Sequence, residues 1–361
     1  MIPASGALRQ TPAALPAWRQ LLADAITDPA ILLTEVGLGP EWLPGALAAA
    51  RLFALRVPRG YVARMRRGDP HDPLLRQVLP LARELETAPG FVPDPVGDAA
   101  ARRAPGLLQK YQGRALLITT GACAIHCRYC FRRHYPYHED ALGPARFAEV
   151  LAWLHAHPEV DEIIFSGGDP LSLGDVRLAA WARELDALPQ LRRLRLHTRL
   201  PVVLPERVDA ALLHWLGGSR LRPVVVIHAN HAQELDDSVA AALGRLRTAG
   251  VTLLNQSVLL AGVNDSLSAL TGLSGRLFDC GVLPYYLHLL DPVAGAAHFA
   301  LPESRARELL AALHARLPGY LLPRLVRETA GAPGKTLLAP ARLPLESLQD
   351  GSGHYLQPAD H

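Results

Sequence analysis

The pattern of hydrophobic and polar positions changes near residue 115 of the chain. Before about residue 100, apolar and charged residues alternate at helical spacing, as in WRQLLADAI and DPLLRQVLPLARELE, and prolines interrupt the pattern. This spacing puts the apolar side chains on one face of a helix. The sequence therefore predicts a helical N-terminal region over residues 1–100.

From about residue 115, short apolar runs alternate with amphipathic segments. The runs are ALLITT, DEIIFSGG, LRRLRLHTR, RPVVVIHAN, VTLLNQSVLL and LPYYLHLLD, and segments such as RFAEVLAWLHAH and ELDDSVAAALGRLRTAG lie between them. Buried strands that alternate with helices form consecutive βα units and a parallel sheet. Six such units predict an α/β fold with a partial (βα)6, TIM-like barrel, whose wider mouth would admit large cofactors.

The C-terminal part of the chain predicts two further features. The segment YLLPRLVRETAGAPGKTLLAP is expected to add a last strand and a glycine-containing loop. We therefore assign residues 101–340 to the barrel with this loop, and residues 341–361 to an irregular C-terminal tail.

Each predicted strand ends in polar or glycine residues. In βα barrels the active site lies at the C-terminal ends of the strands, so we expect these residues to converge on one cavity. They are Thr119 and Thr120; Ser166, Gly167, Gly168 and Asp169; His197, Thr198 and Arg199; His228 and Asn230; Asn255, Gln256 and Ser257; and His288 and Asp291.

Composition and charge narrow the class of protein. Hydrophobic residues make up 49% and charged residues 20%, the balance of a soluble globular protein. The formal charge of +3 is too small an excess to indicate nucleic acid. No stretch approaches the roughly 18 apolar residues of a membrane span, and MIPASGALRQTPAALPAW lacks a signal-peptide pattern. We expect a cytoplasmic protein with no membrane partner and no direct nucleic-acid partner.

Three of the four cysteines lie together in GACAIHCRYCFRRHYPY, directly after the first predicted strand. They are Cys123, Cys127 and Cys130, and this grouping does not suit a disulfide framework, so reduced thiols are the better interpretation. The fourth, Cys280, stands far away in the sequence and is expected to be inert core.

Three thiolates on one short loop leave two kinds of metal site open. A zinc site needs a fourth ligand, which His126 or His134 would supply, and a zinc-knuckle nucleic-acid binder is thus one alternative. An iron–sulfur cluster is normally held by four cysteines, so three indicate a cubane with one iron open to an exogenous ligand.

The spacing C-x3-C-x2-C, with Tyr129 before the third cysteine, resembles the signature of the radical S-adenosylmethionine (SAM) enzymes. The resemblance implies a [4Fe-4S] cluster whose open iron chelates SAM, which one electron from an external reductant cleaves to a 5′-deoxyadenosyl radical. The string SGGDP follows the second predicted strand, where glycines let the backbone approach closely. It implies a SAM site in which Asp169 meets the ammonium, formed by Ser166, Gly167, Gly168 and Asp169.

Residues from about 85 to 340 resemble the lysine 2,3-aminomutase family. The segments occur in that family's order: LLQKYQGRALLITTGACAIHCRYCFRRHYPY, IIFSGGDPL, LRLHTRLPVVLPERV, HANHAQEL, NQSVLLAGVND, PYYLHLLDPVAGAAHF and GKT. The resemblance implies that Lys335 forms the internal Schiff base with pyridoxal 5′-phosphate (PLP), because a lysine amine can form an imine. A phosphate-binding P-loop is the rival for GAPGKT, but that motif requires glycine where Thr329 stands.

Other cofactor-binding positions follow from the same resemblance. The family grips the PLP phosphate just upstream of the cysteines, where Lys110, Tyr111 and Arg114 stand. Lys110 replaces the usual arginine and loses its bidentate fork, which weakens that assignment. His228 and Gln256 match polar positions near SAM.

The substrate positions also follow from the resemblance. Arg132 matches the residue that pairs with the substrate α-carboxylate, and Asp291 and Glu328 match the acidic pair that meets the ε-ammonium of L-lysine. A buried ammonium needs such partners. For Arg133 and His134, a solvated basic run and a cluster-supporting one both stay open.

Glu328, in place of the more usual aspartate, resembles the branch that makes β-lysine for elongation factor P. The chain also lacks the cysteine-bearing C-terminal extension of the catabolic enzymes, so a monomer without zinc is expected. The implied reaction converts L-lysine to (R)-β-lysine, which a lysyl-tRNA-synthetase-like ligase attaches to the factor. A catabolic or osmolyte-forming lysine aminomutase, or one for another amino acid, is the enzymatic alternative.

Overall fold

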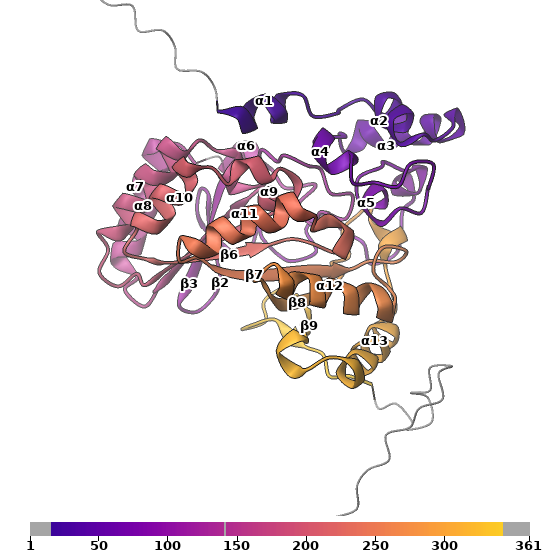
Figure 1. Ribbon diagram of the computed structural model, residues 1–361. Helices are drawn as coiled ribbons and strands as arrows, with labels where there is room; N and C mark the ends of the chain where they lie inside the picture. Colours follow the sequence, from indigo (N-terminus) through magenta and orange to yellow (C-terminus); the bar gives the residue numbers. More distant parts are fainter. Residues whose placement is uncertain (1–15, 141, 342–361) are drawn as a thin grey trace, which may run out of the picture.

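The computed structural model describes residues 16–140 and 142–341, whose strands form one sheet in chain order (Figure 1). Strands β3 to β9 run parallel to one another. At the two ends of the sheet, β1 pairs antiparallel with β2, β2 with β3, and β10 with β9. The strands are β1 (Arg102–Ala104), β2 (Leu107–Tyr111), β3 (Arg114–Thr120), β4 (Glu162–Gly167), β5 (Arg193–Thr198), β6 (Arg222–Ile227), β7 (Thr252–Leu259), β8 (Leu283–Leu289), β9 (Arg324–Arg327) and β10 (Thr336–Leu337).

The six predicted βα units are confirmed, because each strand from β3 to β8 is followed by at least one helix. Figure 1 shows these helices around the outside of the sheet. The arrangement is a partial barrel, and the predicted last strand is β9. The helices are α6 (Tyr137–Asp140), α7 (Pro144–Ala156), α8 (Asp175–Asp186), α9 (Leu200–Val203), α10 (Ala210–Gly218), α11 (Asp237–Thr248), α12 (Leu267–Asp279) and α13 (Glu303–Arg316).

The described part of the N-terminal region contains several short helices. DPLLRQVLPLARELE gives only one α-helical turn and a 3-10 turn, because Pro80 cannot continue a helix. Trp18, Leu32 and Tyr61 of this region share one hydrophobic cluster with barrel residues such as Phe165. The helices are α1 (Ala17–Ala23), α2 (Pro29–Val36), α3 (Leu43–Leu52), α4 (Arg59–Val62) and α5 (Pro73–Arg76).

Short 3-10 helices connect many of these elements. They cover Pro40–Trp42, Ala82–Leu85, Pro170–Ser172, Pro205–Arg207, Ala232–Glu234, Ala297–Phe299 and Gly319–Leu321. No helix in the described ranges has the length and apolar character needed to cross a lipid bilayer. The predicted boundary near residue 100 stays a prediction, and nearly all of the predicted tail lies outside the described residues.

The hairpin of β2 and β3 was not predicted. Tyr111 pairs with Arg114 across a tight turn in which Gly113 has a φ of 77°, a left-handed conformation that favours glycine. Gln109 and Lys110 interrupt the apolar pattern of β2, so the sequence pattern did not predict a strand there. The hairpin matters because it brings Lys110 and Tyr111 beside the first parallel strand.

Buried ion pairs attach the cysteine loop to the N-terminal region. Arg128 donates from Nε and Nη2 to the two carboxylate oxygens of Glu84, at 2.8 and 2.5 Å, and both side chains are fully buried. Arg133 donates to the same carboxylate at 2.8 Å with its side chain 1% exposed. The Arg128 amide also donates to Gln77 O at 2.9 Å. Arg133 therefore supports the cysteine loop, one of the two interpretations left open by the sequence.

We predict that Glu84→Gln destabilises the protein by about 3–5 kcal/mol, because it leaves two buried guanidinium groups without their counter-charge. Urea denaturation of the cofactor-free protein measures this. Exposed Glu86 is the matched control, and Glu86→Gln should change the free energy of unfolding by less than about 0.5 kcal/mol. Equal unfolding midpoints for the two variants would contradict the prediction.

Candidate active site

A cavity of approximately 400 Å³ lies at the C-terminal ends of the parallel strands. Its size is that of a typical small-molecule or cofactor site. All of the predicted site residues line it: Cys123, Cys127, Cys130, Lys110, Tyr111, Arg114, Arg132, Ser166, Gly167, Gly168, Asp169, His228, Gln256, Asp291, Glu328 and Lys335.

The expected convergence of strand ends is confirmed in part, because successive residues of a strand face opposite sides. On β7, Gln256 lines the cavity, whereas Asn255 and Ser257 face a separate small pocket behind it. At the end of β3, the Thr119 hydroxyl donates to Ser166 O at 2.8 Å and does not line the cavity. Alternation thus divides the polar end of β7 between cavity and core, whereas the polar residues named for β4, β5, β6 and β8 all line the cavity.

Two glycines at the end of β4 let this strand contact the start of the cysteine loop. The Gly168 amide donates to Thr120 O at 2.7 Å and the Asp169 amide donates to Ala122 O at 2.8 Å. A Cβ at Gly167 or Gly168 would lie 2.5 Å from a backbone oxygen, and Gly167 has a φ of 118°. Only glycine permits this approach.

The Asp169 carboxylate is fully occupied within the protein. It accepts from the Thr198 hydroxyl at 2.7 Å and from the backbone amides of Arg199 at 2.7 Å, Leu171 at 3.0 Å and Leu200 at 3.1 Å. Burial raises the pKa of Asp169 to about 6, against these donors, which favour the charged form. The observed role of Asp169 is to join β4 to β5, and its contact with the SAM ammonium stays a prediction.

The three cysteines of the loop form one wall of the cavity. Burial raises the pKa of Cys123 well above its usual value, and the charges of Cys130 and Cys127 raise it further. Burial and the charge of Cys127 likewise raise the pKa of Cys130 to about 11. The ionised forms of the three thiols repel one another, so they need a positively charged partner. The three cysteines therefore fit an iron–sulfur cluster, which thiolates ligate.

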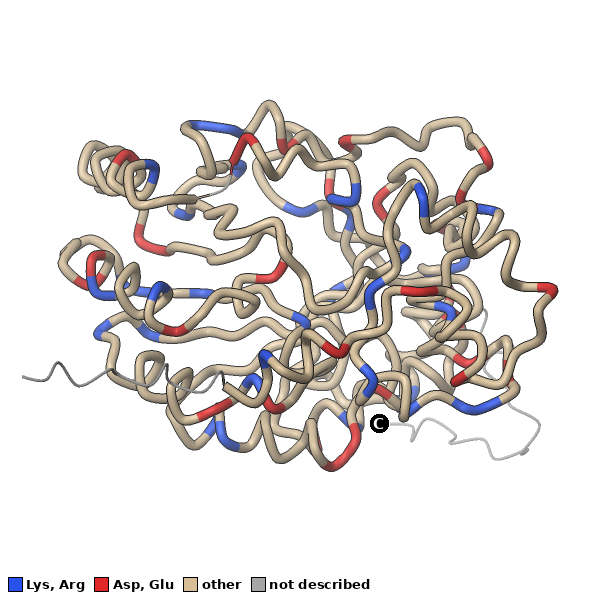
Figure 2. The backbone as a smooth tube through the Cα atoms, turned by 90° about the horizontal axis from the view of Figure 1, so that it is seen from above, with Lys and Arg blue, Asp and Glu red and all other residues tan. Residues whose placement is uncertain are grey.

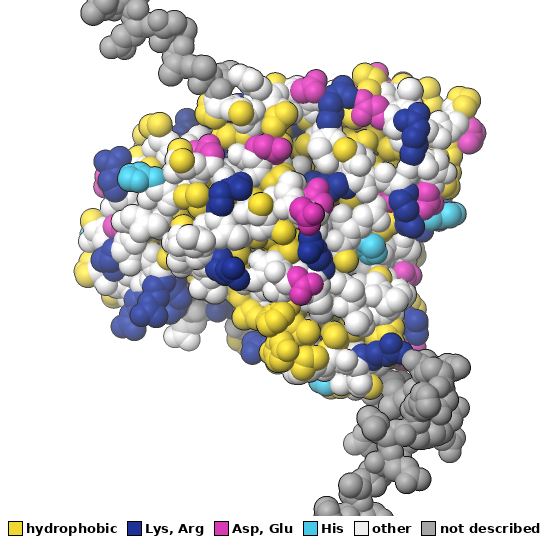
Figure 3. All heavy atoms as spheres, viewed as in Figure 1, with side chains coloured by type: hydrophobic (Ala, Val, Ile, Leu, Met, Phe, Trp, Pro, Cys, Tyr) yellow, Lys and Arg dark blue, Asp and Glu magenta, His cyan; other side chains and the backbone are white. Residues whose placement is uncertain are grey.

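The histidines of the zinc alternative make other contacts. His126 Nδ1 lies 2.8 Å from Ala54 O and its ring stacks on Phe53, while His134 Nε2 lies 3.0 Å from Ala294 O. Among the described residues, no set of three or more His, Cys, Asp or Glu side chains is grouped tightly enough to bind one common metal ion, as a zinc knuckle would require. Basic and acidic residues are interspersed along the backbone and over the visible face (Figures 2 and 3), without the basic stripe of a nucleic-acid binder.

One group of side chains in the cavity is cationic and is organised by Asp98. Arg132 Nε donates to Asp98 Oδ2 at 2.6 Å and its Nη1 donates to the Ser166 hydroxyl at 3.1 Å. Lys110 Nζ lies 2.7 Å from Asp98 Oδ1. Burial alone would raise the pKa of Asp98, but Arg132 and Lys110 lower it to about 2. The sequence did not reveal Asp98, because GDAA lies outside every predicted strand end.

A second group in the cavity is acidic and contains Lys335, and Lys110 Nζ lies 3.8 Å from its Glu328 Oε1. Glu328 accepts from Lys335 Nζ and from the Tyr111 hydroxyl, the latter at 2.5 Å. Asp291 is half-buried and close enough to feel their charges, and desolvation together with the charge of Glu328 raises its pKa to about 7. The full sequence contains only two lysines, Lys110 and Lys335, and both line this cavity.

The three residues predicted to bind the PLP phosphate lie together in the cavity, but two of them already contact carboxylates of the protein. Lys110 contacts Asp98 and Tyr111 contacts Glu328, whereas the Arg114 guanidinium stacks over the Tyr111 ring at 4.4 Å. No described carboxylate forms an ion pair with Arg114. An unpaired guanidinium and a lysine amine in one cavity fit a PLP molecule, with its phosphate at Arg114.

Histidines with lowered pKa values also line the cavity. Burial lowers the pKa of His228 to about 4, and its Nε2 lies 3.0 Å from the Gln256 amide nitrogen. Burial also holds the pKa values of His197 and His288 well below their usual range. The Nε2 atoms of His197 and His288 are buried without a hydrogen-bond partner. Such atoms fit a cavity that holds a polar cofactor.

Comparisons with known proteins identify relatives of this chain. A model of the Radical SAM superfamily matches residues 117–219. The L-lysine 2,3-aminomutase of Escherichia coli (strain K12) is 49% identical, over 89% of this chain and 94% of that protein. The L-lysine 2,3-aminomutase of Clostridium subterminale is 31% identical, over 90% of this chain and 78% of that protein.

A solved radical SAM methyltransferase from Sphaerobacter thermophilus is 19% identical, with a TM-score of 0.43, over 61% of this chain and 68% of that one. Radical SAM lysine 2,3-aminomutases are isomerases that use a [4Fe-4S] cluster, SAM and PLP. The identity to the L-lysine 2,3-aminomutases excludes the zinc-knuckle alternative. With 49% identity across nearly the full length of a relative, the chain belongs to the lysine 2,3-aminomutase family of radical SAM enzymes.

Proposed function

We propose that this enzyme converts L-lysine to (R)-β-lysine for the modification of elongation factor P. One observation carries the reaction: three thiols, a lysine amine and neighbouring groups of basic and acidic side chains line one cavity at the mouth of the barrel. A lysine molecule has the matching charges, a carboxylate near one end and an ammonium at the other.

The charged residues orient the substrate. Arg132, held by Asp98, presents its guanidinium to the α-carboxylate, and Asp291 with Glu328 receives the ε-ammonium. These attractions act in a site shielded from water, where charge interactions are stronger than in solution. Holding both ends of lysine fixes which carbon faces the radical source, which lowers the entropic cost of reaction.

The bound cofactors supply the chemistry that side chains lack, a carbon-centred radical from SAM and the cluster and an imine from PLP. Cys123, Cys127 and Cys130 would hold the cluster, and the SGGD segment with His228 and Gln256 would contact SAM. Lys335 would hold PLP, with Glu328 as its counter-ion, and Arg114 would receive the phosphate. The buried walls exclude water from the radical.

The use of the product rests on the branch of the family. Glu328 stands where aspartate is more usual, and this replacement resembles the branch that makes β-lysine for elongation factor P. A lysyl-tRNA-synthetase-like ligase would attach the product to the factor. An external one-electron reductant, a cytoplasmic location and a monomeric state complete the proposal.

We predict that anaerobic assays of the reconstituted enzyme convert L-lysine to (R)-β-lysine. Chiral derivatisation followed by mass spectrometry separates the isomers, and lysyl-modified factor is tested in parallel as a substrate. Deletion of the gene should remove the β-lysyl mass from elongation factor P. If β-lysine forms in the assay but the factor is unchanged by deletion, the product serves another purpose. Absence of β-lysine would contradict the activity itself.

We predict that borohydride reduction of the PLP-loaded protein fixes a pyridoxyl group on Lys335. Because the chain has only two lysines, peptide mapping has two side-chain outcomes to distinguish. Lys110→Arg should keep the label and Lys335→Arg should lose it, since the Lys110 ammonium is held by Asp98. A label on Lys110 in the unmodified enzyme would show that the assignment of Lys335 is wrong.

We predict that kcat/KM for lysine falls as the pH drops below about 7, approaching tenfold per unit. The pKa of Asp291 is raised to about 7, so its carboxylate, which must be ionised to receive the ammonium, is protonated below that pH. Asp291→Asn should lower kcat/KM roughly 100-fold and remove this limb of the profile. Asp279→Asn, at an exposed position of α12, is the control. An Asp291→Asn profile that keeps the limb would disprove the assignment.

A further inference from the structure

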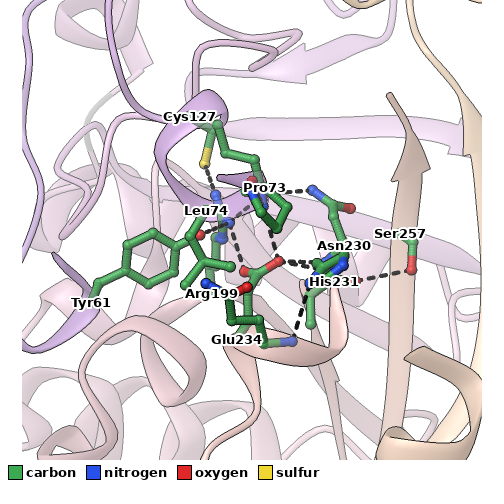
Figure 4. A network of polar contacts seen from close by, with 12 residues as sticks. Tyr61, Pro73, Leu74, Cys127, Arg199, Asn230, His231, Glu234 and Ser257 are labelled. Carbon is green, nitrogen blue, oxygen red and sulfur yellow. Dashed lines mark hydrogen bonds and ion pairs between the residues drawn. The ribbon is translucent and has the colours of Figure 1, made fainter. Parts of the chain in front are cut away.

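Arg199, directly after β5, connects a cluster ligand to the N-terminal region (Figure 4). Its Nη1 donates to Cys127 Sγ at 2.8 Å. Its Nη2 donates to Gln77 Oε1 at 2.7 Å, to Glu234 Oε2 at 2.8 Å and to the Tyr61 hydroxyl at 3.1 Å. The side chain is 4% exposed. One edge of a buried guanidinium therefore faces the sulfur while the other is held by three acceptors.

The partners of Arg199 are themselves fixed. Glu234 is fully buried, and its Oε1 accepts from the backbone amides of Asn230 at 2.8 Å and His231 at 3.0 Å. The Gln77 side-chain amide donates to the same oxygen at 3.2 Å. The backbone amide of Arg199 donates to Asp169. The guanidinium can therefore leave the Cys127 sulfur only by breaking several buried hydrogen bonds.

We propose that Arg199 is a positioning residue that sets the reduction potential of the cluster through Cys127. This inference rests on the proposed function only in requiring a cluster at the three cysteines. Reduction transfers one electron from an external low-potential carrier to the cluster; no bond forms or breaks, and the site gains one negative charge. Hydrogen bonds to ligand sulfurs and nearby charge are what tune such clusters. Arg199 stabilises the added electron and raises the potential.

Glu234 has the opposite effect on the same electron. Its buried negative charge lies on the far side of the guanidinium from Cys127, so it partly cancels the field of Arg199 at the sulfur. The pair thus allows substitutions with opposite predicted signs. A purely structural role would not produce this pattern, because loss of packing has no reason to raise the potential in one variant and lower it in the other.

The test is an anaerobic redox titration of the reconstituted, SAM-free protein, followed by electron paramagnetic resonance of the reduced cluster. Arg199→Met should weaken the electron affinity at least tenfold, which lowers the midpoint potential by about 59 mV for a one-electron couple. Arg199→Lys keeps the charge and should lose less than half of that. Glu234→Gln should raise the potential. The exchangeable-proton coupling from the Arg199 donor should disappear in Arg199→Met.

Arg207 provides the matched control. It is also fully buried and ion-paired, with Asp175 at 2.8 Å, but it does not line the cavity. Arg207→Met should lower stability without moving the potential. An unchanged potential in Arg199→Met overturns the inference, and so does an equal shift in Arg207→Met. If the Arg199→Met protein binds no iron, the Glu234→Gln protein provides the deciding measurement. An unchanged or lowered potential in Glu234→Gln then overturns the inference. Absence of a cluster from the unmodified protein instead contradicts the proposed function.

Discussion

Charge that is buried away from water must be compensated within hydrogen-bonding distance, and this constraint shapes the whole site. Two arginines on or beside the cysteine loop, Arg128 and Arg199, are almost fully buried, and each is paired with a fully buried glutamate, Glu84 or Glu234. Glu84 comes from the N-terminal region and Glu234 from the connection after β6. Removing either carboxylate would leave a guanidinium uncompensated. The loop that would carry the cluster is therefore held from both sides.

The same constraint explains the electrical asymmetry of the cavity. Asp98 is shared by Arg132 and Lys110, which leaves a net positive charge to receive a carboxylate. Glu328 pairs with Lys335 and lies 3.8 Å from Lys110, and burial together with the charge of Glu328 raises the pKa of nearby Asp291 to about 7. A ligand with an added ammonium relieves the repulsion between these two carboxylates. Substrate orientation thus follows from how the protein distributes its counter-charges.

Much of the fold could be predicted, because the strong local signals are physical ones. The six apolar runs became β3 to β8, since each run has the length of a strand, buries at least one face and is followed by a helix. Proline at position 80 cut a predicted helical stretch into short turns. The β2–β3 hairpin was missed because polar residues in β2 hide its period. At the site, the cysteines, the glycines and Lys335 stood out through their spacing and residue type, whereas Asp98 had no such signal.

The sequence by itself determined the chemistry available: three thiols at fixed spacing on one loop, two lysines in the whole chain, and polar residues at the strand ends. These are local properties, because they depend only on the types of residues and their spacing along the chain. Only the tertiary structure decided which of the polar residues face the cavity, because side-chain alternation sends Gln256 inward and Asn255 away from it. It also decided that Asp98 and Gln77 contribute to the site. A buried charge or donor needs a partner within hydrogen-bonding distance, and the fold supplies that partner regardless of distance along the chain.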